Sequence, residues 1–174
     1  MPPQARNPGG APAEALQVVS AEVLESRTLL SAVTFEYNSL NVTLDGSDSA
    51  VFQLSGGNVG VLINGTSAGP SAPVGDVYYI SVSGGEGANY IDLNAVTSAN
   101  GFSSLYYISI DGYGGDDTII GTGLEDQING GGGNDSILAG SGNDTVYGDN
   151  GADTIFGEAG FDELSGDSGT DALY

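Results

Sequence analysis

A nine-residue repeat occupies the C-terminal third of the chain. From Gly112 to Tyr174 the sequence divides into seven consecutive units, with no insertion or deletion. They read GYGGDDTII, GTGLEDQIN, GGGGNDSIL, AGSGNDTVY, GDNGADTIF, GEAGFDELS and GDSGTDALY. Position eight is always aliphatic, and position four is Gly in every unit except one, which has Leu124. Position six is always Asp: Asp117, Asp126, Asp135, Asp144, Asp153, Asp162 and Asp171. Such regularity predicts that each unit folds alike and stacks on its neighbours.

Each unit is best interpreted as a turn of six residues followed by a strand of three. Glycine allows backbone conformations with positive φ, so the chain can turn sharply there. The aliphatic residue at position eight alternates with outward-facing neighbours, as in a strand with one buried face. Two units then form one coil, and turns that are two units apart in the sequence stack roughly 4.8 Å apart on the same side.

This stacking predicts a metal site between successive turns. It places Asp117 over Asp135, and four further Asp pairs follow at the same offset. Two carboxylates at this spacing repel by about 3 kcal/mol at an effective dielectric constant of 20. A Ca²⁺ ion reverses the sign because it accepts six to eight oxygen ligands in flexible geometry. Mg²⁺ demands stricter geometry, and soft metals lack Cys or His ligands here.

The charge balance also favours cations as partners. The chain has 23 acidic residues, no Lys, no His, and only two Arg, so its net charge is −21. We therefore expect no nucleic-acid binding, which requires basic residues, and no docking to anionic membranes. No apolar run approaches ~18 residues, so membrane insertion is not expected either. There is no Cys and hence no disulfide framework.

Calcium binding is expected to be coupled to folding. The predicted core holds mostly one aliphatic side chain per repeat unit, which would struggle to offset the ordering entropy. We predict that residues 112–174 are largely unfolded without calcium and fold when it binds.

The rest of the chain divides into two predicted regions. Residues 1–32 are a disordered or short helical leader, with helical spacing between 13 and 30. Residues 33–111 are β-rich, and we expect irregular parallel β coils there, through which the solenoid begins. Residues 78–92, YYISVSGGEGANYID, align without gaps with residues 106–120, YYISIDGYGGDDTII. This match at one fixed offset suggests successive coils of one parallel solenoid.

The nonapeptide closely resembles the repeats-in-toxin (RTX), or haemolysin-type, calcium-binding repeat, G-G-x-G-x-D-x-aliphatic-x. The unit at 130–138 matches it at every defined position. The resemblance implies an all-β fold, a right-handed parallel β-roll with several Ca²⁺ ions between stacked turns, and export from bacteria. It also implies that the Asp residues at position six are side-chain ligands. Glycines that would supply or permit carbonyl ligands are Gly112, Gly115, Gly130, Gly131, Gly133, Gly140, Gly142, Gly148, Gly151, Gly157 and Gly160.

Two units depart from the family pattern. Leu124 stands at position four, so we expect the loop at 121–126 to be strained and its site weakened. The unit at 84–92 has Asn89 at the Asp position, and the match between residues 78–92 and 106–120 predicts that Asn89 lies beneath Asp117.

A second resemblance concerns location. Residues 24–32, LESRTLLSA, are similar to the LEPR-x-LL motif of large bacterial surface proteins, with Ser26 in place of Pro. The N-terminus lacks the basic start and apolar core of a secretory signal peptide. Together with the repeats, the motif favours a secreted, extracellular or cell-surface protein, and a glycan or cell-surface partner remains open.

We expect a non-catalytic protein, with two alternatives left open. One is a fragment of an extracellular enzyme such as a polysaccharide lyase or epimerase, and the other is an adhesive spacer. The lack of His excludes a Ser-His-Asp triad and a His-ligated zinc site. A site built on Tyr78, Tyr106 or Asp92 stays possible. The acidic residues at position two, such as Asp149, are expected to be solvated, and Tyr113, Tyr147 and Phe156 to cover the roll surface.

Overall fold

The computed structural model describes residues 31–174, which form strands with two short 3₁₀ segments and no α-helix in that range. The expectation of an all-β fold is therefore confirmed for these residues. The predicted N-terminal helix and most of the motif at 24–32 lie outside the described residues.

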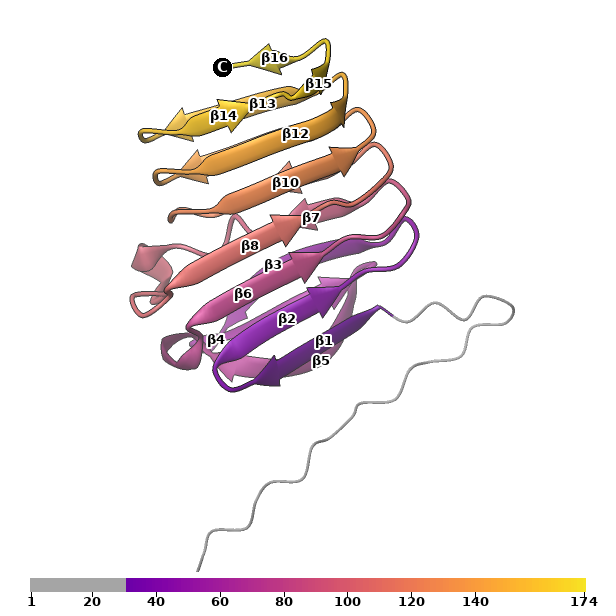
Figure 1. Ribbon diagram of the computed structural model, residues 1–174. Coiled ribbons are helices and arrows are strands. Elements are labelled where there is room, and N and C mark those ends of the chain that lie inside the picture. Colours follow the sequence, from indigo (N-terminus) through magenta and orange to yellow (C-terminus); the bar gives the residue numbers. More distant parts are fainter. Residues whose placement is uncertain (1–30) are drawn as a thin grey trace, which may run out of the picture.

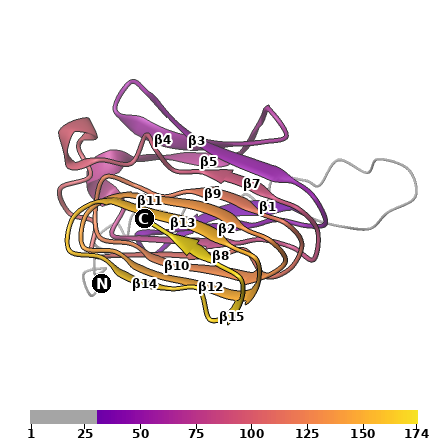
Figure 2. The ribbon, with the colours of Figure 1, turned by 90° about the horizontal axis from the view of Figure 1, so that it is seen from above.

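Two sheets of eight strands face each other (Figures 1 and 2). The first sheet has the order β1-β2-β6-β8-β10-β12-β14, with β15 beside β12. Its strands are β1 (Ala32–Glu36), β2 (Ser39–Thr43), β6 (Tyr79–Ser83), β8 (Tyr107–Asp111), β10 (Gln127–Gly132), β12 (Thr145–Gly151), β14 (Glu163–Ser165) and β15 (Ser168–Gly169). The second sheet has the order β16-β13-β11-β9-β7-β3-β4-β5. Its strands are β3 (Ser49–Ser55), β4 (Asn58–Ile63), β5 (Thr66–Pro73), β7 (Tyr90–Asp92), β9 (Thr118–Ile120), β11 (Ser136–Ser141), β13 (Thr154–Ala159) and β16 (Ala172–Leu173). The 3₁₀ segments are η1 (Val74–Asp76) and η2 (Ser98–Asn100).

Consecutive repeat units alternate between the two sheets, so neighbouring strands within a sheet are parallel. Ile128 pairs with Val146 in the first sheet, and Ile137 pairs with Ile155 in the second. Before the repeats the offset between paired strands is longer, as in the pairing of Tyr79 with Tyr107. This is the offset that the match between residues 78–92 and 106–120 predicts. Both sheets continue from the region before the repeats into the repeats without interruption, since β8 pairs with β10 and β7 pairs with β9.

The N-terminal end differs from the predicted parallel coils. β1 pairs with β2, β3 with β4 and β4 with β5 in antiparallel fashion. The reason is local turn chemistry, because each pair is joined by two residues with positive φ: Tyr37–Asn38, Gly56–Gly57 and Asn64–Gly65. Two successive residues of this kind form the type I′ turn that joins antiparallel strands. The parallel expectation is therefore wrong for these hairpins and holds from β2–β6 and β3–β7 onward.

Ladders of aliphatic side chains fill the space between the sheets. The ladder of the first sheet contains Val42, Val82, Ile110, Ile128, Val146 and Leu164, and that of the second contains Ala50, Ile91, Ile119, Ile137, Ile155 and Leu173. Position eight of the repeat therefore lies in the core, as predicted. The last member, Leu173, is 45% exposed. No helix within residues 31–174 is long and apolar enough to cross a membrane.

Candidate metal centre

The turns between the two sheets stack into two columns, gathered at opposite ends of the coil in the view along the stack (Figure 2). We use turn for positions one to six of a unit, into which strands such as β10 and β12 extend. The first column contains the turns at 45–48, 84–89, 112–117, 130–135, 148–153 and 166–171. The second column contains the turns at 121–126, 139–144 and 157–162. We call the layers nearer to the N-terminus lower, since they lie at the bottom of Figure 1.

The position-six carboxylates connect each turn to the turn below. Asp117 N–H donates to Asp135 Oδ1 at 2.8 Å, and Asp126 N–H donates to Asp144 Oδ1 at 2.9 Å. The same bond recurs at 2.8–3.1 Å in the upper layers, from Asp135, Asp144 and Asp153 to Asp153, Asp162 and Asp171 respectively. The structure therefore brings the predicted Asp side chains into register at the predicted offset of two repeat units.

The second carboxylate oxygen of these residues is the feature that suggests a ligand. Asp117, Asp135, Asp144 and Asp153 are each at most 2% exposed. Their Oδ2 atoms are buried and have no hydrogen-bond partner. A buried anionic oxygen without a partner is costly, and a bound cation is one way of compensating it.

Glycine at position one makes room for this oxygen. A Cβ atom added to Gly112, Gly130 or Gly148 would fall against Oδ2 of the Asp at position six in the same turn. The carbonyl oxygen of the position-one residue one layer above lies there too, as Gly130 O does beside Gly112. Gly157 likewise lies against Oδ2 of the Asp in its own turn. A side chain would fill the cradle in which these oxygens meet.

Glycine at position four is required by backbone conformation and by close approach. Gly115, Gly133, Gly142, Gly151 and Gly160 have φ between +100° and +158°. A Cβ on Gly133 would overlap the carbonyl oxygen of Gly115 in the turn below, and Gly151 meets Gly133 in the same way.

The two predicted glycines at position two behave similarly. Gly131 and Gly140 have φ of +101° and +114° and lie over the carbonyl oxygens of Tyr113 and Thr122. Most of the predicted glycines thus lie against turn oxygens, whereas Gly115 lies against the backbone of Gly87 and Ala88.

Burial of these carboxylates disfavours their charged form when no cation is bound. Desolvation is the main cause, and it raises the pKa of Asp117 and Asp126 to about 7 and that of Asp135 to about 6. The carboxylate in the next layer raises each pKa further, while the hydrogen bonds from backbone N–H groups oppose the shift. The pKa values of Asp144 and Asp153 are raised for the same reasons.

Within residues 31–174 no three acidic side chains converge on one point. Each gap between turns offers at most two carboxylates from position six, with backbone carbonyl oxygens around them. A cation held here must therefore take much of its coordination from carbonyl oxygens. This donor set suits Ca²⁺, which accepts carboxylate and carbonyl oxygens together.

Comparison with known families agrees with this donor set. The model of the RTX calcium-binding nonapeptide repeat matches in four copies, over residues 111–146, 120–155 and 147–174. The C-terminal stack consists of RTX repeats, and we call residues 112–174 the RTX stack. Repeats of this family bind several Ca²⁺ ions, so the RTX stack binds calcium. Comparison with curated proteins and with solved structures finds no match to the chain.

The turn at 121–126 departs from its neighbours in the RTX stack, but Leu124 does not strain it. Leu124 is absent from the residues with positive φ. Thr122 closes this turn instead: its N–H donates to Asp126 Oδ2 at 2.7 Å and its hydroxyl donates to Asp126 Oδ1 at 2.9 Å. The Thr122 hydroxyl also accepts a bond from Leu124 N–H at 3.0 Å. The prediction of strain is therefore wrong, and the Asp126 carboxylate is already bonded within its own turn.

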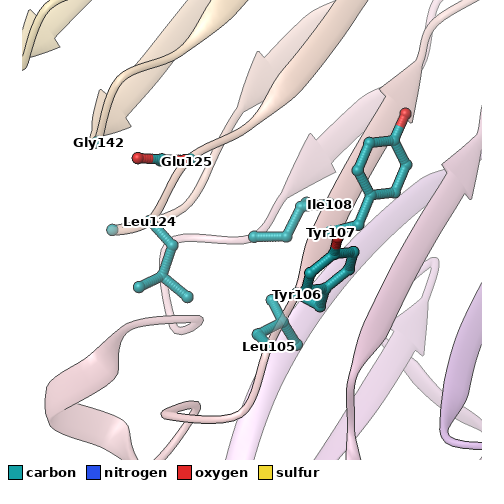
Figure 3. Close-up of a pocket in the computed structure, with 8 residues that line it drawn as sticks. Leu105, Tyr106, Tyr107, Ile108, Leu124, Glu125 and Gly142 are labelled. Atoms are coloured by element: carbon teal, nitrogen blue, oxygen red, sulfur yellow. The ribbon is translucent and has the colours of Figure 1, made fainter.

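Leu124 borders a shallow hollow of about 400 Å³ that the second column helps to line (Figure 3). Tyr107 lines it from β8 and Tyr106 from the preceding loop, and Glu125 is its one carboxylate. Tyr106 contacts Tyr79 edge to face at 6.0 Å between ring centroids. Of the residues proposed for an enzyme site, Tyr78 and Tyr106 precede strands of the first sheet, whereas Asp92 ends β7 in the second. Asp92 thus lies in the sheet opposite the strands that follow the two tyrosines.

Asn89 lies beneath Asp117 as the sequence match predicts, because its N–H donates to Asp117 Oδ1 at 2.7 Å. Sequence reasoning missed other members of the columns. Gly121 and Gly166 lie against Oδ2 of the Asp in their own turn, as Gly112 does, which their place in the repeat could have indicated.

A second ladder was also missed. It runs along position five, where Asp116 Oδ1 accepts from Asn134 N–H at 2.7 Å and Asn134 Oδ1 accepts from Ala152 N–H at 2.9 Å. The signal for it was the Asp or Asn at this position in three of the seven units.

Proposed function

We propose that the RTX stack is a calcium-dependent folding module, a parallel β-roll in a secreted or surface-displayed protein that is not itself a catalyst. The observation that carries the proposal is the set of buried, unpartnered Oδ2 atoms of Asp117, Asp135, Asp144 and Asp153. Their carboxylates are fixed by backbone N–H groups of the layer below, and they face oxygen-lined gaps with no basic side chain. No Lys or Arg occurs beyond Arg27, so only an added cation can supply the positive charge.

The energy scale supports coupling between binding and folding. If each site had a dissociation constant near ~0.2 mM, free Ca²⁺ at ~2 mM would add about 1.4 kcal/mol per site. Five gaps between repeat turns would then add roughly 7 kcal/mol, which is comparable to the whole stability of a small domain. The stack without ions would lack this contribution and would carry the repulsion between its carboxylates.

Two further observations support the proposed location outside the cell or on its surface. The LESRTLLSA segment is similar to a motif of bacterial surface proteins, and RTX repeats are typical of exported proteins. The extracellular space supplies millimolar calcium, which is the range that the arithmetic above requires. We therefore propose that the module folds after export, when it first meets calcium.

The test is a calcium titration of the full chain. Far-UV circular dichroism in chelator should show little β signal from the RTX stack, and excess Ca²⁺ should restore it. Isothermal titration should detect several ions. Asp135→Ala should lose the heat of about two of them, since this carboxylate lies between the layers below and above it.

Glu163→Gln is the matched control, because Glu163 is exposed and lies one residue after the position-six Asp162. It removes a charge of the same sign from the same stack and should leave the number of bound ions unchanged. An unchanged β signal on adding Ca²⁺ to the wild-type chain would refute the proposal.

A further inference from the structure

Two turns differ from the turns above them in that their position-six side chain is fully bonded within the protein. They are the turn at 84–89, which contains Asn89, and the turn at 121–126, which contains Asp126. Neither side chain has an unpartnered oxygen, whereas the buried Asp residues above them all do. Each of these turns lies directly below the first turn of its column that has an orphan oxygen.

Asn89 is 3% exposed, and its amide group bonds both its own turn and the turn below. Its Oδ1 accepts from Gly85 N–H at 2.7 Å and lies against Gly84, as Asp117 Oδ2 lies against Gly112. Its Nδ2 donates to the carbonyl oxygens of Gly46 at 3.0 Å and Asp48 at 3.1 Å in the turn below. The amide thus directs its hydrogens at carbonyl oxygens, which are the groups that a cation would coordinate between two turns.

Strand pairing places the turn at 84–89 in one column with Asp48 below it and Asp117 above it. Ser49 pairs with Tyr90, and Tyr90 pairs with Thr118, so Asp48, Asn89 and Asp117 follow one another at the same register. An Asp in place of Asn89 would complete a continuous column of carboxylates. The chain instead has a neutral side chain with two donors at this level.

We propose that Asn89 and Thr122 end the calcium-binding part of the stack from below, so that the base of the molecule folds without calcium. By base we mean residues 31–111 together with the turn at 121–126. In the first column the Asn89 amide connects two turns as a bound ion would. In the second column Thr122 bonds the Asp126 carboxylate in place of an ion. The inference rests on the proposed function, because it assigns where the calcium requirement begins.

The core of the base supports this assignment. Leu40, Ile80, Ile91, Leu93 and Phe102 are at most 1% exposed and belong to the hydrophobic core. Three antiparallel hairpin pairings close the lower end of the molecule, and their ladders are formed by backbone groups alone. Large apolar side chains thus provide in the base the stabilisation that the ions provide in the repeats.

Asn89→Asp converts the two donor contacts into contacts between oxygen atoms. The new carboxylate would face the carbonyl oxygens of Gly46 and Asp48 at the separations that now hold hydrogen bonds. The base of this variant should therefore require calcium, which it does not require in the wild type. Asn94→Asp is the matched control, because Asn94 is exposed and the change in charge is the same.

Hydrogen exchange of the full chain, read by mass spectrometry in chelator and in excess Ca²⁺, tests the inference. Wild-type peptides from residues 38–111 should be protected under both conditions, and peptides from 127–174 only with Ca²⁺. In Asn89→Asp, peptides that cover 84–92 should lose about tenfold or more of their protection in chelator and regain it with Ca²⁺. Asn94→Asp should match the wild type. Thr122→Val should make the turn at 121–126 dependent on Ca²⁺ in the same way.

The outcomes separate the two proposals. Loss of protection in chelator over 38–111 of the wild type, alongside 127–174, would overturn this inference and leave the proposed function standing. Protection of 127–174 that ignores Ca²⁺ would instead overturn the proposed function. An Asn89→Asp chain that keeps its protection in chelator, or that stays unprotected with Ca²⁺, would overturn the part assigned to Asn89.

Discussion

Asp135 Oδ1 accepts a 2.8 Å hydrogen bond from the backbone N–H of Asp117, two repeat units earlier in the chain. The bond fixes the carboxylate of one layer on the backbone of the layer below, while Oδ2 stays buried without a partner. One side chain therefore both sets the spacing of the layers and offers a ligand. The register and the calcium chemistry of the stack consequently depend on the same residue at position six.

The position-four glycines should be intolerant of any side chain. Gly133→Ala would place a Cβ against the Gly115 carbonyl oxygen at a φ of +139°, and we expect a loss of more than about 2 kcal/mol of unfolding free energy. Urea unfolding in saturating Ca²⁺ measures this loss. Gly75→Ala serves as the control, since it has an ordinary φ and open space around it, and it should change stability little. Equal effects of the two variants would contradict the role given to Gly133.

Acid should partly replace calcium. The pKa of Asp117 and Asp126 is raised to about 7 and that of Asp135 to about 6, so the folded state binds protons more tightly than the unfolded state. This contribution to stability is fully present below the ordinary carboxyl pKa of about 4 and is lost as the pH rises through about 6 to 7.

The β signal of the chain in calcium-stripped buffer should therefore fall between pH 5 and pH 8. Circular dichroism across this range, repeated on Asp117→Asn, gives the measurement. The variant has one titrating carboxyl fewer and should show a shallower change. A calcium-free chain that gains β structure as the pH rises would show that the sign is wrong.

Magnesium should be a poor substitute for calcium. The gaps between turns offer two carboxylates and several carbonyl oxygens, which suits the larger and more flexible coordination shell of Ca²⁺. At equal millimolar concentration, Mg²⁺ should restore less β signal than Ca²⁺ and should be displaced by it. Titration of each ion, followed by competition, measures the difference. Equal midpoints for the two ions would mean that the gaps bind divalent charge without regard to size.

The aliphatic ladders should contribute stability even when calcium is saturating. Ile137 is fully buried between Ile119 and Ile155, and its replacement by Ala should cost about 2–5 kcal/mol. Leu138 is the next residue of the same strand, faces outward and is 36% exposed, so Leu138→Ala should cost clearly less. Thermal unfolding with excess Ca²⁺ compares the two variants. A similar drop for both would contradict the division into inner and outer faces.

The repeat made much of the C-terminal third predictable. Invariant Asp and aliphatic positions at a fixed spacing leave few arrangements that bury one face and stack the turns. The predicted strands, the stacking of Asp117 with Asp135 and the burial of Ile128 all followed from that spacing. The hydrogen bonds on the outer surface, such as the ladder of Asp116 and Asn134, have a weaker sequence signal because surface positions vary between units.

The region before the repeats was less predictable because a single internal match, between residues 78–92 and 106–120, constrains it. Antiparallel hairpins there could have been found from Gly56–Gly57 and Asn64–Gly65, which are strong two-residue turn signals between apolar runs. Leu124 illustrates a different difficulty. Its strain was inferred from the missing glycine alone, whereas the Thr122 hydroxyl two residues earlier lets the turn take another path.

The layers above the base bond only to the layers next to them, and this has a consequence for how the module responds to intermediate calcium. Order in such an array is lost from the end farthest from its support. Partial loading should therefore yield a shorter rod with a frayed tip, and each added layer extends it by roughly 4.8 Å. The length of the ordered stack should therefore increase with the calcium concentration.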